Sequence, residues 1–348
     1  MPAHGLETIT KPATTEDQSY LDYLMSVRNF AIVDWFPELA EKINTAVEDS
    51  GKDDTDYQEI SDMIDDIPRI GSWKRMMRSQ QALTWNKLRD SYHADPDKHL
   101  AKLNEAEAAT GRLHYKKDFQ VPDSACYDIH LQPGGYCKDE LAGFIFEHGT
   151  RVFYQGMNDK DELHKLYIDM LKQPTDGTIN RILDLGCSIG QCTTALKDAY
   201  PEAEVWGLDV ALPLLRYANY RANEQQSEVH FQQALAENLP QQDNSFDAVF
   251  AYILFHETPE HTFAPILEEA LRVLRPGGTL TIVDAPLGTL PAANRMWQKF
   301  DAQYNCEPYA PAFIESDFTG LIKAAGFDEI EQAPTPTFLS LTTAVKPA

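Results

Sequence analysis

The segment that most constrains the fold is residues 181–190, where an apolar run is followed at once by two glycines. The apolar residues from Ile182 to Leu185 have the pattern of a strand that is buried on both faces, as in a parallel sheet. Gly186 and Gly190 lack the side chains that would keep the backbone away from a ligand. A buried strand, a glycine turn and a following helix indicate a nucleotide-binding turn in an α/β fold.

A second apolar run, residues 205–209, ends in Asp209. This carboxylate follows the glycines by roughly 20 positions, the separation at which a neighbouring strand delivers an acidic residue to ribose hydroxyls. The glycine spacing is G-x-x-x-G after Asp184, which differs from the G-x-G-x-x-G that cradles a dinucleotide pyrophosphate. The sequence therefore predicts a ribose-bearing ligand that need not contain a pyrophosphate.

Residues 182–190 resemble the first motif of the class I S-adenosylmethionine-dependent methyltransferases, which reads hydrophobic-hydrophobic-Asp-hydrophobic-Gly-x-x-x-Gly. Further segments that resemble this family follow in the family's order, at residues 236–240, 244–250, 267–280 and 318–327. The resemblance implies a Rossmann-like seven-stranded α/β domain that uses S-adenosylmethionine as its cofactor. It is similar to the small-molecule members, and in particular to the methyltransferases of quinone biosynthesis.

The resemblance also implies which residues bind the cofactor. One departure concerns the adenine loop, where Leu235 stands at a position that is acidic in many relatives. Glu237 is the candidate substitute, although a solvated loop carboxylate is the commoner role for such a residue. The predicted cofactor-binding residues are Asp184, Gly186, Cys187, Gly190, Asp209, Val210, Ala236 and Glu237.

The length of 348 residues exceeds what one hydrophobic core usually organises, so two domains are expected. Residues 1–155 show helical spacing of apolar residues, with Pro37 marking a predicted break near Trp35. We expect this half to be a helical cap, a substrate lid or a dimerisation unit, which would make the protein a homodimer. Residues 156–348 are expected to form the methyltransferase domain, ending in a strand over residues 338–345.

The charge balance restricts the partners. Lys and Arg number 30 against 54 Asp and Glu, and the net charge of −24 disfavours nucleic acid or an anionic membrane as substrate. The five cysteines contain no C-x-x-C pair, which argues against structural zinc and a disulfide framework. Residues 1–16 are polar and do not resemble a signal peptide or membrane anchor. We therefore expect a cytoplasmic protein whose acceptor is a small molecule.

Methyl transfer to oxygen or carbon requires that a proton leave the acceptor, and the predicted base lies just after the fourth strand of the domain. His256 and Glu257 are the catalytic candidates, because an imidazole beside a carboxylate titrates near neutrality. The alternative is that His256 only braces the turn. His256 and His261 lie five positions apart across a proline, which does not fit the H-E-x-x-H zinc motif, and no metal is predicted. A metal held by His130, His148 and His256 stays open as an alternative.

Residues 128–136 contain a Pro-Gly-Gly turn and are interpreted as a lid over the acceptor site, or otherwise as an interdomain linker. The aromatic residues near the site favour a planar or apolar acceptor, although they could also box an ammonium group. The predicted acceptor-contacting residues are Tyr136, His148, Tyr252, Asp284, Trp297 and Tyr304.

These patterns together predict S-adenosylmethionine-dependent methyl transfer to a small molecule. Two alternatives are kept beside this prediction. One is a cofactor-binding partner subunit without catalytic activity, in which His256 would be structural. The other is a nicotinamide-dependent oxidoreductase, which the glycine spacing disfavours.

Overall fold

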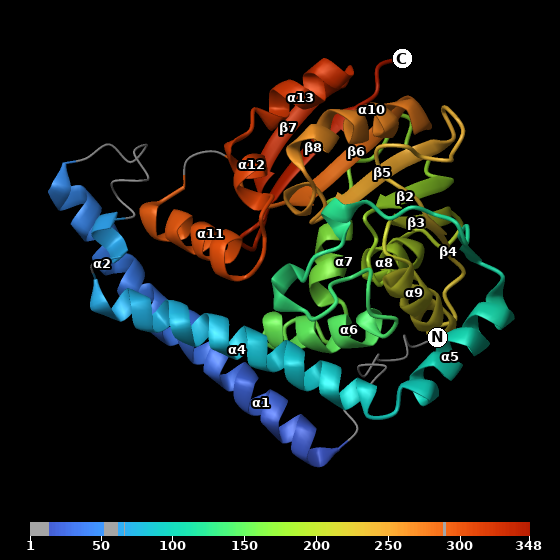
Figure 1. Ribbon diagram of the computed structural model, residues 1–348. Coiled ribbons are helices and arrows are strands. Elements are labelled where there is room, and N and C mark those ends of the chain that lie inside the picture. Colours follow the sequence, from blue (N-terminus) through green and yellow to red (C-terminus); the bar gives the residue numbers. More distant parts are fainter. Residues whose placement is uncertain (1–13, 52–61, 66, 288–289) are drawn as a thin grey trace.

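The core of the protein is one twisted, mostly parallel sheet in the strand order β1-β4-β3-β2-β5-β6-β8-β7 (Figure 1). The computed structural model describes residues 14–51, 62–65, 67–287 and 290–348, so most of the segment 1–16 lies outside the described residues. Strands β1 to β6 pair in parallel, and β8 and β7 add two antiparallel strands. The strands are β1 (Leu113–His114), β2 (Arg181–Leu185), β3 (Glu204–Asp209), β4 (His230–Gln233), β5 (Phe246–Tyr252), β6 (Leu274–Asp284), β7 (Asp328–Pro334) and β8 (Ser340–Val345).

The predicted α/β class is confirmed, and residues 156–348 supply the seven predicted strands, β2 to β8. The eighth strand is β1, which comes from the half of the chain that was expected to be helical. It adds only two residues to the edge of the sheet, pairing Leu113 with Phe231 and His114 with Gln232. A two-residue strand is too short to show the alternation by which a strand is recognised in a sequence.

Helices cover both faces of the sheet, because the central strands are apolar on both sides. Leu183 and Val249 face one core together with α10 (Phe263–Val273) and α13 (Phe318–Ala325). Ile182 and Phe250 face the opposite core, together with α7 (Glu162–Ile168), α8 (Gln191–Ala199) and α9 (Leu212–Glu224). This arrangement leaves the carboxyl ends of the parallel strands open to a ligand.

The N-terminal half forms long helices, as predicted, but the break near Trp35 is wrong. The chain continues from α1 (Thr15–Asn29) through a π-helical segment, η1 (Phe30–Trp35), into α2 (Phe36–Ser50). Pro37 lies in the first turn of α2, where a missing N–H is tolerated. The half also contains α4 (Pro68–His93), α5 (Pro96–Thr110) and α6 (Ala142–Phe153). In Figure 1, α1 and α4 lie side by side as an arm beneath the rest of the molecule.

The two halves of the sequence share cores. Helix α11 (Ala292–Tyr304), which follows β6, packs against the N-terminal helices through Phe300 and Trp297. The ring centres of these residues lie 5.3 and 5.0 Å from that of Trp73 on α4. The domain boundary at residue 155 therefore stays a prediction, because an apolar core crosses from one side of it to the other.

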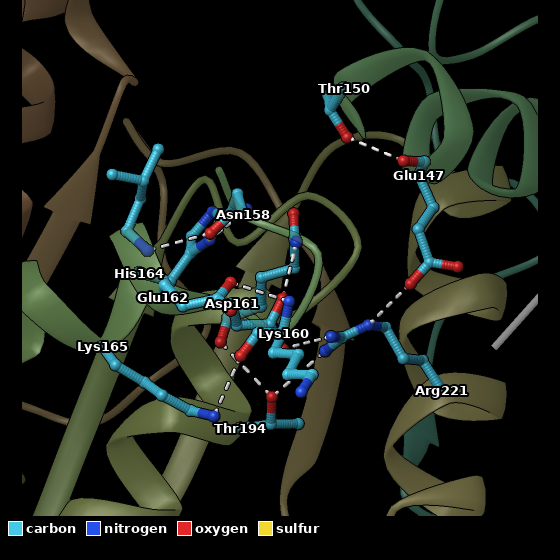
Figure 2. Close-up of polar contacts among 12 residues, drawn as sticks. Glu147, Thr150, Asn158, Lys160, Asp161, Glu162, His164, Lys165, Thr194 and Arg221 are labelled. Carbon is cyan, nitrogen blue, oxygen red and sulfur yellow. Dashed lines mark hydrogen bonds and ion pairs between the residues drawn. The ribbon is translucent and has the colours of Figure 1, made fainter. Parts of the chain in front are cut away.

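A buried network of charged groups joins the halves at a second place (Figure 2). Arg221 of α9 donates from Nε to Glu147 of α6 over 3.1 Å and forms an ion pair with Asp161, in the loop before α7. Asp161 also accepts from Gln191 at the start of α8, over 2.7 Å. Burial raises the pKa of Asp161, but Arg221 outweighs this effect, so that the pKa is lowered. The network fixes the helix that follows the glycine turn.

All five cysteines are free, as the sequence predicts. In the described part of the chain, no helix has the length and apolar character that crossing a membrane requires.

Replacing Arg221 by methionine should destabilise the fold by about 3–5 kcal/mol, because two buried carboxylates lose their cation. The stabilisation of Asp161 in the wild-type protein is present above pH 3.8, its ordinary pKa, and is lost as the pH falls below it. Urea unfolding at pH 7 and at about pH 2.5, below the ordinary pKa of Asp161, measures both effects. Arg112→Met, which removes an exposed ion pair with Glu228, is the control and should cost about 0–1 kcal/mol. Equal losses in the two variants would contradict this account.

Candidate active site

The glycine turn after β2 requires both of its glycines, for different reasons. Gly186 has a φ of 70°, and a Cβ there would lie 2.8 Å from a methyl carbon of Leu254. Gly190 has a φ of 77° and caps α8, and a Cβ there would lie 2.7 Å from the ring of Phe231. Gly186 lines the central cavity and Gly190 does not. Gly190 therefore allows close packing of α8 against β4, and does not itself face a ligand.

Asp209 ends β3 at the carboxyl edge of the sheet, where the sequence predicts a ribose-binding carboxylate. Its two oxygens accept backbone N–H groups of Ala211 over 2.8 Å and of Ser188 over 2.9 Å. Burial raises the pKa of Asp209 to about 6, although these amides oppose the rise. A carboxylate has roughly four acceptor positions. Asp209 can therefore bind two ligand hydroxyls while it continues to hold the glycine turn.

Asp184, in β2, has one oxygen that the protein leaves unsatisfied. Oδ2 accepts from Thr193 Oγ1 over 2.6 Å, while the buried Oδ1 has no hydrogen-bond partner among the described residues. Burial, with a smaller contribution from the nearby Asp209, raises the pKa of Asp184 to about 7. A buried acceptor without a partner is costly, and a ligand N–H or ammonium group at the cavity wall would satisfy it.

A cavity of about 640 Å³ lies over these residues, within the size range of small-molecule sites. Its wall brings together the strand ends, the segment 234–237 and the N-terminal helices. Cys187 lines it as well, but burial raises the pKa of this thiol well above its ordinary value, which fits a packing role rather than a nucleophile. The predicted cofactor-binding residues in the cavity wall are Asp184, Gly186, Cys187, Asp209, Val210, Ala236 and Glu237.

Three of the six predicted acceptor-contacting residues, Tyr136, Tyr252 and Trp297, line this cavity, and three are placed elsewhere. His148 is 2% exposed in the helical core, with Nδ1 2.6 Å from the hydroxyl of Tyr92. Burial lowers its pKa to about 3. Tyr304 is 41% exposed on α11. Neither His148 nor Tyr304 lines the cavity. The residue type alone does not indicate which side of a helix faces the cavity.

Asp284 is the third residue outside the cavity wall, and its place explains the orientation of His256. It ends β6, and it accepts backbone N–H groups of Leu254, Phe255 and Ala285 over 3.2, 2.8 and 2.7 Å. Its carboxylate also contacts Nδ1 of His256, which lines the cavity. Burial lowers the pKa of His256, but Asp284, with smaller contributions from Glu257 and Glu307, outweighs this effect and raises the pKa to about 9.

Glu257 lies beside His256 in the sequence but faces another histidine. The Oε1 atom of Glu257 is 3.1 Å from Nε2 of His130, and Nδ1 of His130 is 2.9 Å from Glu307. The carboxylate that contacts His256 is therefore Asp284, from the adjacent strand, and not the predicted Glu257. Asp284 and His256 are far apart in the sequence, and they meet only because β5 and β6 pair in parallel.

The three histidines of the metal alternative do not converge. His130 lies between two glutamates, His148 contacts Tyr92, and His256 contacts Asp284. Within the ranges that the structure describes, no three His, Cys, Asp or Glu side chains are arranged to hold a metal ion.

Sequence reasoning missed several residues of the cavity wall. Arg28, Ile32 and Phe36 reach the cavity from α1, η1 and α2, and Asp301 and Glu307 reach it from the segment after β6. The spacing of four between the first three is a signal for one helix face. This spacing did not indicate that the shared helix face lines the cavity.

Several independent features place this chain in one class of protein. A parallel sheet, a glycine turn, a carboxylate at the end of the next strand and a cavity over the strand ends define a Rossmann-like domain that binds a nucleoside-containing cofactor. Residues 182–278 match the family described as "Methyltransferase domain". The chain is 33% identical over 218 residues to the O-methyltransferase cnsE of Penicillium expansum, covering 59% of this chain and 72% of that protein. It therefore belongs to the class I S-adenosylmethionine-dependent methyltransferases.

Other relatives match over shorter stretches. A demethylmenaquinone methyltransferase of Thermus thermophilus is 41% identical over 106 residues, which cover 30% of this chain and 47% of that protein. One of Lactiplantibacillus plantarum is 34% identical over 120 residues, covering 34% of this chain and 50% of the relative. The chain thus spans about half the length of these relatives. The matches confirm the resemblance drawn from the sequence motifs, and they favour the methyltransferase over the nicotinamide-dependent alternative.

The residues present fit the cofactor of this family. Asp209 has acceptor positions for the ribose hydroxyls, and the unsatisfied Oδ1 of Asp184 fits the ammonium group of the methionine part. Gly186 opens the turn to the ligand. Leu235 and Glu237 both line the cavity, so Glu237 stays the candidate for the adenine amino group.

Replacing Asp209 by asparagine should weaken binding of S-adenosylmethionine and of S-adenosylhomocysteine by roughly 10- to 100-fold, because charge-assisted hydrogen bonds to the ribose are lost. Asparagine preserves the side-chain volume at this turn. Calorimetric titration measures both affinities. Asp198→Asn, on the exposed side of α8, is the control and should bind as the wild type does. An unchanged affinity in the Asp209 variant would refute the assigned role.

Proposed function

We propose that this protein transfers the methyl group of S-adenosylmethionine to an oxygen or an acidic carbon of a small, planar, largely apolar acceptor, with His256 as general base. The observation that carries the proposal is the buried contact of Asp284 with His256, because His256 lines the same cavity as the predicted cofactor-binding residues. A base that is held by a carboxylate and lines a cavity of small-molecule size is suited to proton removal.

The geometry of this pair supports a directed base. Asp284 is fixed by three backbone amides and stays oriented toward Nδ1 of His256. When Nδ1 carries the proton that faces Asp284, Nε2 is the nitrogen with a lone pair for the acceptor. The bound cofactor supplies an activated methyl group. The chain contributes by aligning the acceptor, excluding water and receiving a proton at Nε2 of His256.

The pKa of about 9 for His256 favours a particular type of acceptor. A phenolic hydroxyl ionises at about 10, so a proton can move from it to His256 with little change in free energy. An enol-type carbon acid of similar acidity meets the same condition. Aromatic side chains that line the cavity suit a planar acceptor, namely Phe36, Tyr136, Phe146, Phe153, Tyr154, Tyr252 and Trp297.

The names of the relatives agree with this acceptor class, since one is an O-methyltransferase and others are demethylmenaquinone methyltransferases. A catalytic role for Glu257 has less support, because its carboxylate contacts His130 instead of His256. The competing function is a cofactor-binding subunit without turnover. The raised pKa of His256 at the cavity wall favours turnover over this alternative, because perturbed pKa values cluster at functional sites. A cytoplasmic location and a homodimer remain predictions from the sequence.

We expect kcat/KM for the acceptor to rise with pH through about 9, because only neutral His256 accepts a proton. His256→Gln should lower kcat by roughly 100- to 10,000-fold and leave cofactor affinity unchanged. The assay follows transfer of a labelled methyl group to a panel of hydroxylated naphthalenes, catechols and hydroquinones, with product detection by mass spectrometry. His261→Gln, in the same turn region, is the matched control. Cofactor binding without transfer to any of these phenols, by wild type and control alike, would favour the subunit without turnover.

A further inference from the structure

His130 joins the N-terminal half to the catalytic region through a pair of carboxylates. It lies in the segment 128–136, between α5 and α6, and its ring nitrogens face Glu307 at 2.9 Å and Glu257 at 3.1 Å. A carboxylate only accepts, so a ring that faces carboxylates with both nitrogens needs a proton on each. Burial lowers the pKa of His130, but the two glutamates outweigh it and raise the pKa to about 10. His130 is therefore an imidazolium ion.

The backbone at this position is held in an uncommon conformation. His130 has a φ of 53° and Leu131 a φ of 66°, in the left-handed region that residues other than glycine seldom occupy. Gln81 of α4 donates to the carbonyl of His130 over 2.9 Å, and the N–H of Leu131 donates to Asp128 over 3.0 Å. Such conformations persist where surrounding contacts over-determine them, and they gather at functional sites.

The charges around His130 come from several elements. Arg28 of α1 donates to the carbonyl of Phe153 over 3.1 Å and lines the same cavity as His130. On α11, burial and the charge of Glu307 raise the pKa of Asp301 to about 8. Burial also raises the pKa of Glu307, but His130 outweighs this effect and the pKa is lowered. The remaining titratable groups nearby are Tyr127, Tyr136, Tyr154 and Cys306.

The same two glutamates act on His256. Asp284 is the carboxylate in contact with His256, and Glu257 and Glu307 favour the charged imidazole from farther away. The positive charge of His130 lies between these glutamates. It therefore compensates two negative charges that would otherwise stabilise protonated His256 and keep it from accepting a proton.

We propose that His130 is a positioning residue for methyl transfer, which holds Glu257 and Glu307 in one ion-paired cluster and so keeps His256 available as the base. This inference rests on the proposed function. The same contacts hold the segment 128–136 to Glu257 and Glu307, and both His130 and Tyr136 of this segment line the cavity. His130 therefore contributes both to the cavity wall and to the charge balance around the base.

The test compares His130→Gln with His130→Lys and follows His256 directly. Each protein is labelled with ¹⁵N-histidine and its imidazole signals are titrated by NMR, with His256→Gln assigning the signal. Glutamine keeps a hydrogen-bond donor but removes the charge, so the pKa of His256 should rise by roughly 0.5–1 unit. Lysine restores a cation and should return the pKa toward that of the wild type. His93→Gln, which removes an exposed histidine facing Asp139, is the matched control and should leave the pKa of His256 unchanged.

In a second variant, we expect the pKa of His256 to shift in the opposite direction. Glu257→Gln removes one of the two carboxylates and should lower the pKa of His256, so a general loss of structure cannot imitate both results. In the methyl-transfer assay, the pH at which kcat/KM is half maximal should move with the NMR value in each variant.

An unshifted His256 signal in His130→Gln would overturn the proposal, whatever the activity. A rise that lysine fails to reverse would overturn it as well, because the effect would then not depend on charge. If the NMR shifts appear as expected but the wild-type protein transfers no methyl group, the ion-paired cluster stands, while the proposed function and the role of His130 in it fail.

Discussion

The rest of the site depends on the contacts of one buried carboxylate, that of Asp284. Strands β5 and β6 are paired in parallel, and this register places the end of β6 beside the turn that leaves β5. Asp284 accepts three backbone amides there and contacts His256, so one side chain fixes both the path of the turn and the orientation of the imidazole. Without this anchor, the turn would have to satisfy those buried amides elsewhere.

Buried charge is also what holds the helical half to the sheet. Arg221 forms ion pairs with Glu147 and Asp161 in one contact region between the halves. His130 forms ion pairs with Glu257 and Glu307 in another. Buried ion pairs add little net stability compared with apolar packing, but removing one partner is costly. This asymmetry favours a single arrangement of the two halves, because a displaced helix would leave several buried carboxylates without a cation.

Much of the fold and half of the site could be predicted, because those parts depend on local patterns. The strand at 182–185, the glycine turn, Asp209 and His256 are each specified within a few residues, and the structure places them at one edge of the sheet. The remaining features depend on packing over long distances. The role of Arg28 depends on which helix face meets the cavity, and that of Glu307 on the path of the loop after α11. Asp284 contacts His256 only because β5 and β6 pair in parallel. His148 has a suitable chemistry, but the core around Tyr92 encloses it.

The structure places the proposed chemistry and the helical part of the cavity wall on different elements. The predicted cofactor-binding residues and His256 lie on strand ends or on short turns that the sheet fixes. Arg28, Ile32 and Phe36, in contrast, form one face of the α1–η1–α2 helix, and the π-helical segment lies where this face meets the cavity. π-Helical turns are rare and occur often at functional sites. Changes along this face can therefore alter which acceptor fits while the sheet keeps its geometry, which is the arrangement expected where one reaction is adapted to different small molecules.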